Sequence, residues 1–212
     1  MGSLNLNLNL LFIIALSLNS QPTDKFIMPS IFSVRPTHPA EAPLLTEIER
    51  SAAQIFLTDT EYAWIATSEV PSVEVHQEFI ANHASWVAVE PDTAQPIGFI
   101  NVQYFDNKCA DNKCSANNLH ICELSVAQKW QGKGAGGALM AFIIAYAKQH
   151  GMATISLTTF RYVVWNAPYY QRLGFVILDE HQLPPTLTAI LQREAAAGFT
   201  PHSRCAMQRL CE

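Results

Sequence analysis

Four glycines, at positions 132, 134, 136 and 137, follow an apolar, β-prone run at residues 120–126 and precede an apolar run with helical spacing at residues 138–148. A glycine-rich turn lets the main chain approach a ligand closely, because no side chain stands between them. The first N–H groups of a helix have no partner inside the helix and point outward. The sequence therefore predicts a strand, turn and helix that bind an anion such as a pyrophosphate.

Two other phosphate-binding motifs fit this turn less well. Gly132, Gly134 and Gly137 satisfy G-x-G-x-x-G, which in dinucleotide-binding folds is followed about 20 positions later by an acidic residue. The chain has no Asp or Glu between residues 124 and 178. A Walker A loop is excluded as well, because no Gly-Lys-Ser or Gly-Lys-Thr stands at the required spacing.

A different pattern does match. Gln131-x-x-Gly134-x-Gly136, preceded by a strand that ends in Leu124-x-Val126, resembles the acyl-CoA pyrophosphate loop of the GCN5-related N-acetyltransferase (GNAT) superfamily. Arg or Gln opens the motif in that family.

A second segment, residues 157–175, resembles the later half of the same signature, with Asn166 and with Tyr170 four residues before Gly174-Phe175. The resemblance covers residues 31–207. It implies a three-layer α/β fold, with a central mixed, mostly antiparallel sheet and helices on both faces. In this family the fourth and fifth strands splay apart, and the pantetheine arm of acetyl-CoA lies in the gap.

The implied reaction, acetyl transfer from acetyl-CoA to a primary amine, needs a base. An alkyl amine has a pKa of ~10.4, so near neutral pH only about one molecule in a thousand is nucleophilic, a penalty of roughly 4 kcal/mol. Glu123 and His120, on or beside the central strand, are the candidate bases, with His120 acting through water. Strand alternation predicts that Glu123 and Ser125 face one side of the sheet while Leu124 and Val126 face the other. A purely structural role stays open for both candidates.

The departing thiolate, whose thiol has a pKa of ~8.5, needs a proton. Tyr170 holds the position at which family members carry a tyrosine general acid, and a phenol of pKa ~10 is protonated at neutral pH. Tyr169 is adjacent, but neighbours on a helix point about 100° apart, so only one of the two can face the sulfur. The alternative for Tyr170 is that it only packs.

The resemblance also implies the residues that hold acetyl-CoA. Asn166 would bond the pantetheine or pyrophosphate region, and the backbone N–H groups of Leu124, Ser125 and Val126 would hold the pantetheine and polarise the acetyl carbonyl. The cradle for the phosphates would consist of Gln131, Gly132, Lys133, Gly134, Ala135 and Gly136.

Charge is unevenly distributed along the chain. Residues 124–178 hold five cations and no carboxylates, whereas the rest of the chain carries a net charge of −10 within an overall −5. A positive segment suits a polyanion such as coenzyme A, and an acidic remainder favours a cationic acceptor. The alternative explanation for the positive segment is that it forms a buried core, where acidic residues are rare. The overall charge argues against nucleic acid as a partner.

The acceptor is predicted to be a small molecule with a primary amine. Aromatic residues could wall its pocket or belong to the core: Tyr62, Trp64, Trp86, Tyr104 and Trp165. A protein or peptide N-acetyltransferase and a non-catalytic acyl-CoA-binding module are the alternative functions. The sequence leaves open whether the chain forms a homodimer.

The five cysteines are an odd count, which is typical of a reducing compartment and not of a disulfide scaffold. Cys109 and Cys114 lie in a duplicated polar stretch without two further ligands at zinc-binding spacing, so no metal site is predicted. A cytoplasmic enzyme is expected, since acetyl-CoA is found inside cells.

Residues 1–27 are predicted to be an extension outside the domain, with residues 28–212 forming one acetyltransferase domain. The apolar run at residues 10–16 is too short to span a bilayer. A weak membrane-associating tail or a targeting segment remains the alternative for this stretch.

Periodicity predicts the elements around the motifs. Helices are expected at residues 41–56, 73–83, 138–148, 166–173 and 186–197. Strands are expected at residues 31–35, 86–90, 96–105, 120–126, 155–160, 175–178 and 204–209. Gly151 is the expected C-terminal cap of the glycine-rich helix.

Overall fold

The computed structural model describes residues 31–108, 115–200 and 202–211. The predicted extension at residues 1–27 and the pair Cys109 and Cys114 lie outside these ranges. The strands are β1 (Ser33–Pro36), β2 (Ser85–Val89), β3 (Pro96–Lys108), β4 (Ser115–Val126), β5 (Thr154–Phe160), β6 (Val176–Ile177) and β7 (Arg204–Leu210). The α-helices are α1 (Ala42–Ala52), α2 (Val73–Ala81), α3 (Ala135–Gln149), α4 (Ala167–Arg172) and α5 (Pro185–Ala196). Short 3₁₀ turns are η1 (Pro39–Glu41), η2 (Ala53–Thr58), η3 (Ala63–Thr67), η4 (Gln128–Trp130) and η5 (Glu180–Gln182).

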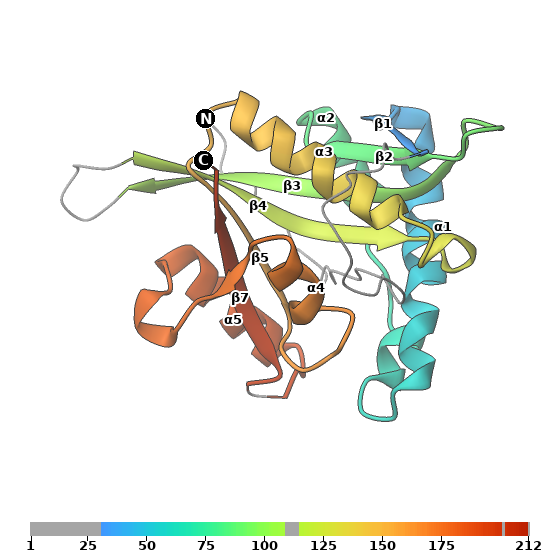
Figure 1. Ribbon diagram of the computed structural model, residues 1–212. Coiled ribbons are helices and arrows are strands. Elements are labelled where there is room, and N and C mark those ends of the chain that lie inside the picture. The colour runs from blue at the N-terminus through green and yellow to red at the C-terminus, as the bar shows by residue number, and fades with distance from the viewer. Residues whose placement is uncertain (1–30, 109–114, 201, 212) are drawn as a thin grey trace.

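The strands form a seven-stranded sheet in the order β1-β2-β3-β4-β5-β7-β6 (Figure 1). Every neighbouring pair is antiparallel except β4 and β5, which run parallel. This arrangement confirms the predicted mixed, mostly antiparallel sheet.

Helices cover both faces of the sheet, as alternation along β2 shows. Trp86 and Ala88 pack in the same cluster as the apolar residues of α3, whereas Val87 and Val89 pack with the apolar residues of α1. Because successive side chains of a strand point to opposite faces, α3 and α1 lie on opposite sides of the sheet. The result is the predicted three-layer α/β fold.

The two central strands pair over only part of their length. The parallel ladder joins residues 118–121 of β4 to residues 154–157 of β5. β4 then continues to Val126, and β5 continues to Phe160 against β7. In Figure 1, β4 runs on toward α1 while β7, the partner of β5, turns away from it. The splay expected between the fourth and fifth strands is therefore present.

A β-bulge lies in β4, just before the splayed end. Asn101 of β3 pairs with Glu123 and the next residue, Val102, pairs with Ile121, so Cys122 is the extra residue. His120 pairs with Gln103, two positions from Asn101 along β3. His120 and Glu123 therefore lie on the same face of the sheet, although their odd spacing would place them on opposite faces of a regular strand.

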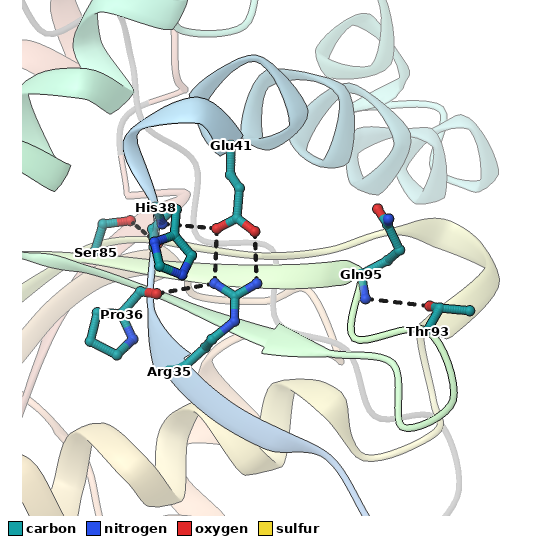
Figure 2. A network of polar contacts seen from close by, with 8 residues as sticks. Arg35, Pro36, His38, Glu41, Ser85, Thr93 and Gln95 are labelled. Atoms are coloured by element: carbon teal, nitrogen blue, oxygen red, sulfur yellow. Dashed lines mark hydrogen bonds and ion pairs between the residues drawn. The ribbon is translucent and has the colours of Figure 1, made fainter.

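An ion pair fixes the start of α1 against β1 (Figure 2). Both guanidinium branches of Arg35 donate to the Glu41 carboxylate, at 2.9 Å and 2.7 Å. The backbone N–H of His38 donates to the same carboxylate at 2.8 Å. The hydrogen bonds from Arg35 lower the pKa of Glu41. This contact fixes the start of α1 against β1. The same helix carries Glu49, a residue of the candidate site.

Two helices differ from their predicted bounds by three or four residues at one end. α3 begins at Ala135, so Gly136 and Gly137 belong to its first turn and not to the loop before it. The helix expected at residues 41–56 is α1 flanked by the 3₁₀ turns η1 and η2. At the end of α3, Gly151 has φ of 66° and its N–H bonds the Lys148 carbonyl, as expected of a helix cap.

Candidate active site

The glycine-rich turn has the backbone geometry of an anion-binding helix start. Gly132 and Gly134 have φ of 73° and 97°, which a residue with a Cβ adopts only under strain. Gly134 is the N-cap of α3, and the first N–H that bonds its carbonyl belongs to Ala138. The N–H groups of residues 135–137 therefore have no intrahelical acceptor and point out of the helix end.

The side chain of Gln131 serves the protein's own main chain. Its amide nitrogen donates to the carbonyl of Val126 at 2.9 Å and to that of Ala52 at 3.2 Å. These bonds tie the turn to the end of β4 and to α1. The predicted contribution of Gln131 to a phosphate cradle would therefore come from its backbone.

Lys133 is exposed beside the turn, with its ammonium 5.0 Å from the centre of the Trp130 ring. Lys129 lies over the same ring at 5.6 Å. These two cations flank the N-terminus of α3, and their charge adds to the attraction for an anion there.

The splayed end of β4 offers main-chain groups to a ligand. Residues 123–126 pair with β3 on one side, but the ladder to β5 has already ended at Ile121. In a paired sheet such groups would bond the neighbouring strand. The predicted backbone contacts of Leu124, Ser125 and Val126 with pantetheine would use this open side.

Glu123 is fully buried on the face opposite the α3 cluster, which contains Leu124 and Val126. Ser125, on the same face, donates its hydroxyl to Glu123 Oε1 at 2.7 Å. A hydrogen bond donated to a carboxylate favours its ionised form. The predicted alternation of β4 is therefore present, and it gives Glu123 a donor two residues away.

His120 lies in a chain of buried hydrogen bonds. Thr154 donates to Asn118, Asn118 donates to Ser156 Oγ, and Ser156 Oγ lies 2.9 Å from His120 Nδ1. Since Ser156 accepts from Asn118, its own proton is directed to the imidazole. Burial lowers the pKa of His120 to about 4, so the ring is neutral at pH 7. These contacts tie β4 to β5 at their parallel ladder.

Tyr170 lies in α4 with its side chain fully buried, and its hydroxyl has no hydrogen-bond partner among the described residues. Burial raises the pKa of Tyr170 well above its ordinary value, and the neighbouring Tyr169 and the charge of Glu123 raise it further. The phenol is therefore protonated at neutral pH and available as a donor. Burial raises the pKa of Tyr169 to about 12.

Asn166, the residue before α4, is fully buried, and neither its amide oxygen nor its amide nitrogen has a partner among the described residues. Buried polar groups without partners cost free energy unless a ligand or water satisfies them. Asn166 and the hydroxyl of Tyr170 are thus two buried polar groups, at the start of α4 and within it, that a ligand could satisfy.

The structure adds three site residues that the sequence reasoning missed. Glu49 of α1 is 1% exposed and its Oε2 lies 3.6 Å from Nε2 of His76 in α2. His76 Nδ1 lies 3.4 Å from the amide nitrogen of Asn101, which pairs with Glu123 across the sheet. The helical spacing of Leu45, Ile48 and Ala52 places Glu49 on the buried stripe of α1, and that position was the available signal.

The five aromatic residues that could line an acceptor pocket lie in different parts of the structure. Tyr62 and Trp165 line a pocket of about 320 Å³ together with Asp59 and Glu61. Trp86 packs on Phe142 and Tyr146 of α3, on the face away from Glu123. Trp64 and Tyr104 are partly exposed.

The described ranges contain neither a metal-binding cluster nor a membrane-spanning helix. No group of three or more His, Cys, Asp or Glu side chains there could hold a metal ion. Within the same ranges, no helix has the length and apolar character needed to cross a membrane.

Comparison with known proteins agrees with this geometry. The model of the acetyltransferase (GNAT) family matches residues 47–175, more than half of the chain, so the chain belongs to this family. It is therefore an acetyl-CoA-dependent acetyltransferase, an acyltransferase by reaction class.

Solved structures show the same fold. The PaiA N-acetyltransferase of Thermoplasma acidophilum, in complex with coenzyme A, is 18% identical with a TM-score of 0.57, over 84% of this chain and 98% of that one. A GNAT-family acetyltransferase of Staphylococcus aureus is 14% identical with a TM-score of 0.60, over 85% of this chain and 99% of that one. N-acetylglutamate synthase of Neisseria gonorrhoeae, complexed with coenzyme A and N-acetyl-glutamate, is 16% identical with a TM-score of 0.59 over 90% of this chain. This chain spans 36% of that synthase.

Proposed function

We propose that this protein transfers the acetyl group of acetyl-CoA directly to the primary amine of a small molecule, with Glu123 as the base and Tyr170 as the acid. The observation that supports the proposal is that these two residues are both buried and that the charge of one acts on the other. They come from β4 and α4, and it is the charge of Glu123 that acts on the pKa of Tyr170.

The buried groups support a binding mode for acetyl-CoA. The pyrophosphate would lie on the N–H groups at the start of α3, beside Lys133. The pantetheine would follow the open side of β4, where its amides can bond main-chain groups of residues 124–126. The side-chain amide of Asn166 would form hydrogen bonds with the same ligand.

The reaction then proceeds by proton transfers that the site can accommodate. Glu123 takes a proton from the acceptor ammonium, and the free amine attacks the acetyl carbonyl, forming the C–N bond. The C–S bond breaks, and the phenol of Tyr170 protonates the departing sulfur. The second N–H proton of the attacking nitrogen returns to the tyrosinate.

Glu123 is a better candidate base than His120 in this arrangement. The imidazole of His120 is neutral, but its Nδ1 is engaged by Ser156 in the ladder between β4 and β5. Burial lowers the pKa of His120, and the charges of Glu194 and Arg193 in α5 act on it as well. The contacts of His120 therefore support a structural role.

A panel of amines tests the proposal. Thiol release from acetyl-CoA is measured with aralkylamines, polyamines, amino acids, aminoglycosides and short peptides with free N-termini, and the acetylated product is identified by mass. Turnover with a small amine supports the proposal. Turnover confined to the peptides would contradict it and favour a protein acetyltransferase, and binding of acetyl-CoA with no turnover would favour a binding module.

A further inference from the structure

Two buried carboxyl groups from different elements are linked inside the protein. Glu49 lies 3.6 Å from His76, His76 lies 3.4 Å from Asn101, and Asn101 pairs with Glu123 across the sheet. Glu49 of α1 and Glu123 of β4 are 1% and 0% exposed. They are close enough for the charge of Glu123 to raise the pKa of Glu49, after the larger effect of burial. Two buried like charges at short range are costly, so such a pair retains a proton.

The surroundings of the two carboxyls decide which one holds that proton. Ser125 donates to Glu123, which favours the ionised form of Glu123. Neither oxygen of Glu49 accepts a hydrogen bond among the described residues, and its ion-pair neighbour at 3.6 Å is His76. Burial lowers the pKa of His76 to about 4, so at neutral pH this neighbour carries no charge.

The contact between Asn101 and His76 fixes which ring nitrogen of His76 carries the proton. Asn101 presents its amide nitrogen, a donor, to His76 Nδ1 at 3.4 Å. Nδ1 of the neutral ring therefore accepts, and the ring proton is on Nε2, which lies 3.6 Å from Glu49 and so forms no hydrogen bond with it. The charge of Glu123 also acts on Cys122 of β4 and Tyr170 of α4, and burial keeps both protonated at neutral pH.

We propose that Glu49 carries the proton of a buried Glu49–Glu123 pair in the resting enzyme, and that a cationic acceptor binding beside the pair displaces this proton to solvent. The proposal rests on the proposed function, because it takes Glu123 as the base for an ammonium acceptor. Glu49 acts through Glu123 and is a positioning residue. The acceptor class that follows is an alkylammonium, since an uncharged arylamine brings no charge to displace the proton.

The protons balance over the whole reaction. An ammonium and acetyl-CoA give an amide, coenzyme A thiol and one proton. The proton of Glu49 leaves when the ammonium binds, and the doubly ionised pair then takes a proton from the ammonium. The pair thereby returns to its resting state, and the tyrosine proton given to sulfur is replaced by the second N–H proton of the amine.

Infrared spectroscopy of the protein without acceptor tests which of the two carboxyl groups, that of Glu49 or that of Glu123, is protonated. A protonated carboxylic acid has its own carbonyl stretch, separate from that of a carboxylate. The wild type and the control Glu47→Gln, an exposed position on the same helix, should show this band at pH 7, and Glu49→Gln should lack it. Its absence from the wild type, or its persistence in Glu49→Gln with loss in Glu123→Gln, would overturn the proposal.

Calorimetry tests the displacement. 2-Phenylethylamine is titrated into the protein–coenzyme A complex, which cannot turn over, in two buffers of different ionisation enthalpy at neutral pH. The wild type and Glu47→Gln should release about one proton per ammonium bound, Glu49→Gln about none, and aniline none from any of them. Equal release by wild type and Glu49→Gln would overturn the proposal while leaving acetyl transfer itself, measured with the amine panel, untouched.

Discussion

Ser125 Oγ donates a hydrogen bond to Glu123 Oε1 across 2.7 Å, and both side chains are fully buried. A hydrogen bond to a charged group contributes about 1.5–3 kcal/mol, so this one stabilises the ionised form of the proposed base. Ser125→Ala should lower kcat/KM about tenfold or more and move the acid limb of its pH profile to higher pH.

The matched control for this change is Ser156→Ala, which removes the hydroxyl next to His120 instead. With Glu123 as the base, Ser156→Ala leaves the shape of the pH profile unchanged. If Ser156→Ala shifts the profile and Ser125→Ala does not, His120 replaces Glu123 in the mechanism.

Substitution of Tyr170 should affect turnover without affecting the binding of acetyl-CoA. Its hydroxyl has no partner among the described residues, so Tyr170→Phe removes the donor without leaving another buried group unsatisfied. We expect turnover to fall about 100-fold or more, as for loss of a general acid, with the Kd of acetyl-CoA unchanged. Tyr169→Phe, the adjacent change, should retain most of the activity. Equal losses in the two variants would argue that Tyr170 only packs.

Gly134 and Gly137 should respond differently to replacement by alanine. Gly134 has φ of 97°, whereas a Cβ on Gly137, inside α3, would meet nothing within 4 Å. Gly134→Ala should cost about 1–2 kcal/mol of folding stability and weaken acetyl-CoA binding, because the helix start must shift. Gly137→Ala should be neutral or stabilise the helix by up to about 1 kcal/mol. Thermal unfolding and direct titration with acetyl-CoA measure both effects, and identical behaviour of the two variants would contradict the assigned geometry.

The local elements of the site could be predicted because short-range patterns determine them. The strand that ends in Val126, the glycine turn and the helix carrying Tyr170 all follow from periodicity, from backbone requirements or from the motif. The inward side chain of Gln131 could not be predicted, because its acceptors, the carbonyls of Ala52 and Val126, come together only in the folded chain.

The cluster of Glu49, His76 and Asn101 shows the same limit. It joins α1, α2 and β3, which no local pattern brings together. The bulge at Cys122 was equally invisible, since it depends on register with β3, and it alone places His120 on the face of Glu123.

Acid should destabilise the protein through its buried histidines. Burial lowers the pKa of His76 and of His120 to about 4 each, below the ordinary 6.5. The unfolded chain therefore binds more protons than the folded chain between pH 6.5 and 4, and stability falls as pH decreases through this window. His120→Gln should flatten the dependence of the unfolding free energy on pH in that range, measured by urea unfolding. An unchanged slope would show that His120 is not buried as a neutral ring.

The Arg35–Glu41 pair has a pH dependence of its own. The pKa of Glu41 is lowered by the hydrogen bonds from Arg35, so its contribution is complete above the ordinary pKa of a carboxyl and is lost as pH falls through the lowered value. Glu41→Gln should lower Tm at pH 7, and the difference from wild type should shrink below about pH 4. A difference that stays constant down to pH 2 would mean that the charge of Glu41 does not matter.

The most direct test of the mechanism is kcat/KM of Glu123→Gln against pH, with an amine that the wild type acetylates and with Glu47→Gln as the control. We predict that Glu123→Gln loses about 100-fold or more at neutral pH, binds acetyl-CoA normally, and recovers activity as rising pH supplies free amine. Activity within a few-fold of wild type, with the same pH profile, would contradict the assignment of Glu123 as the base.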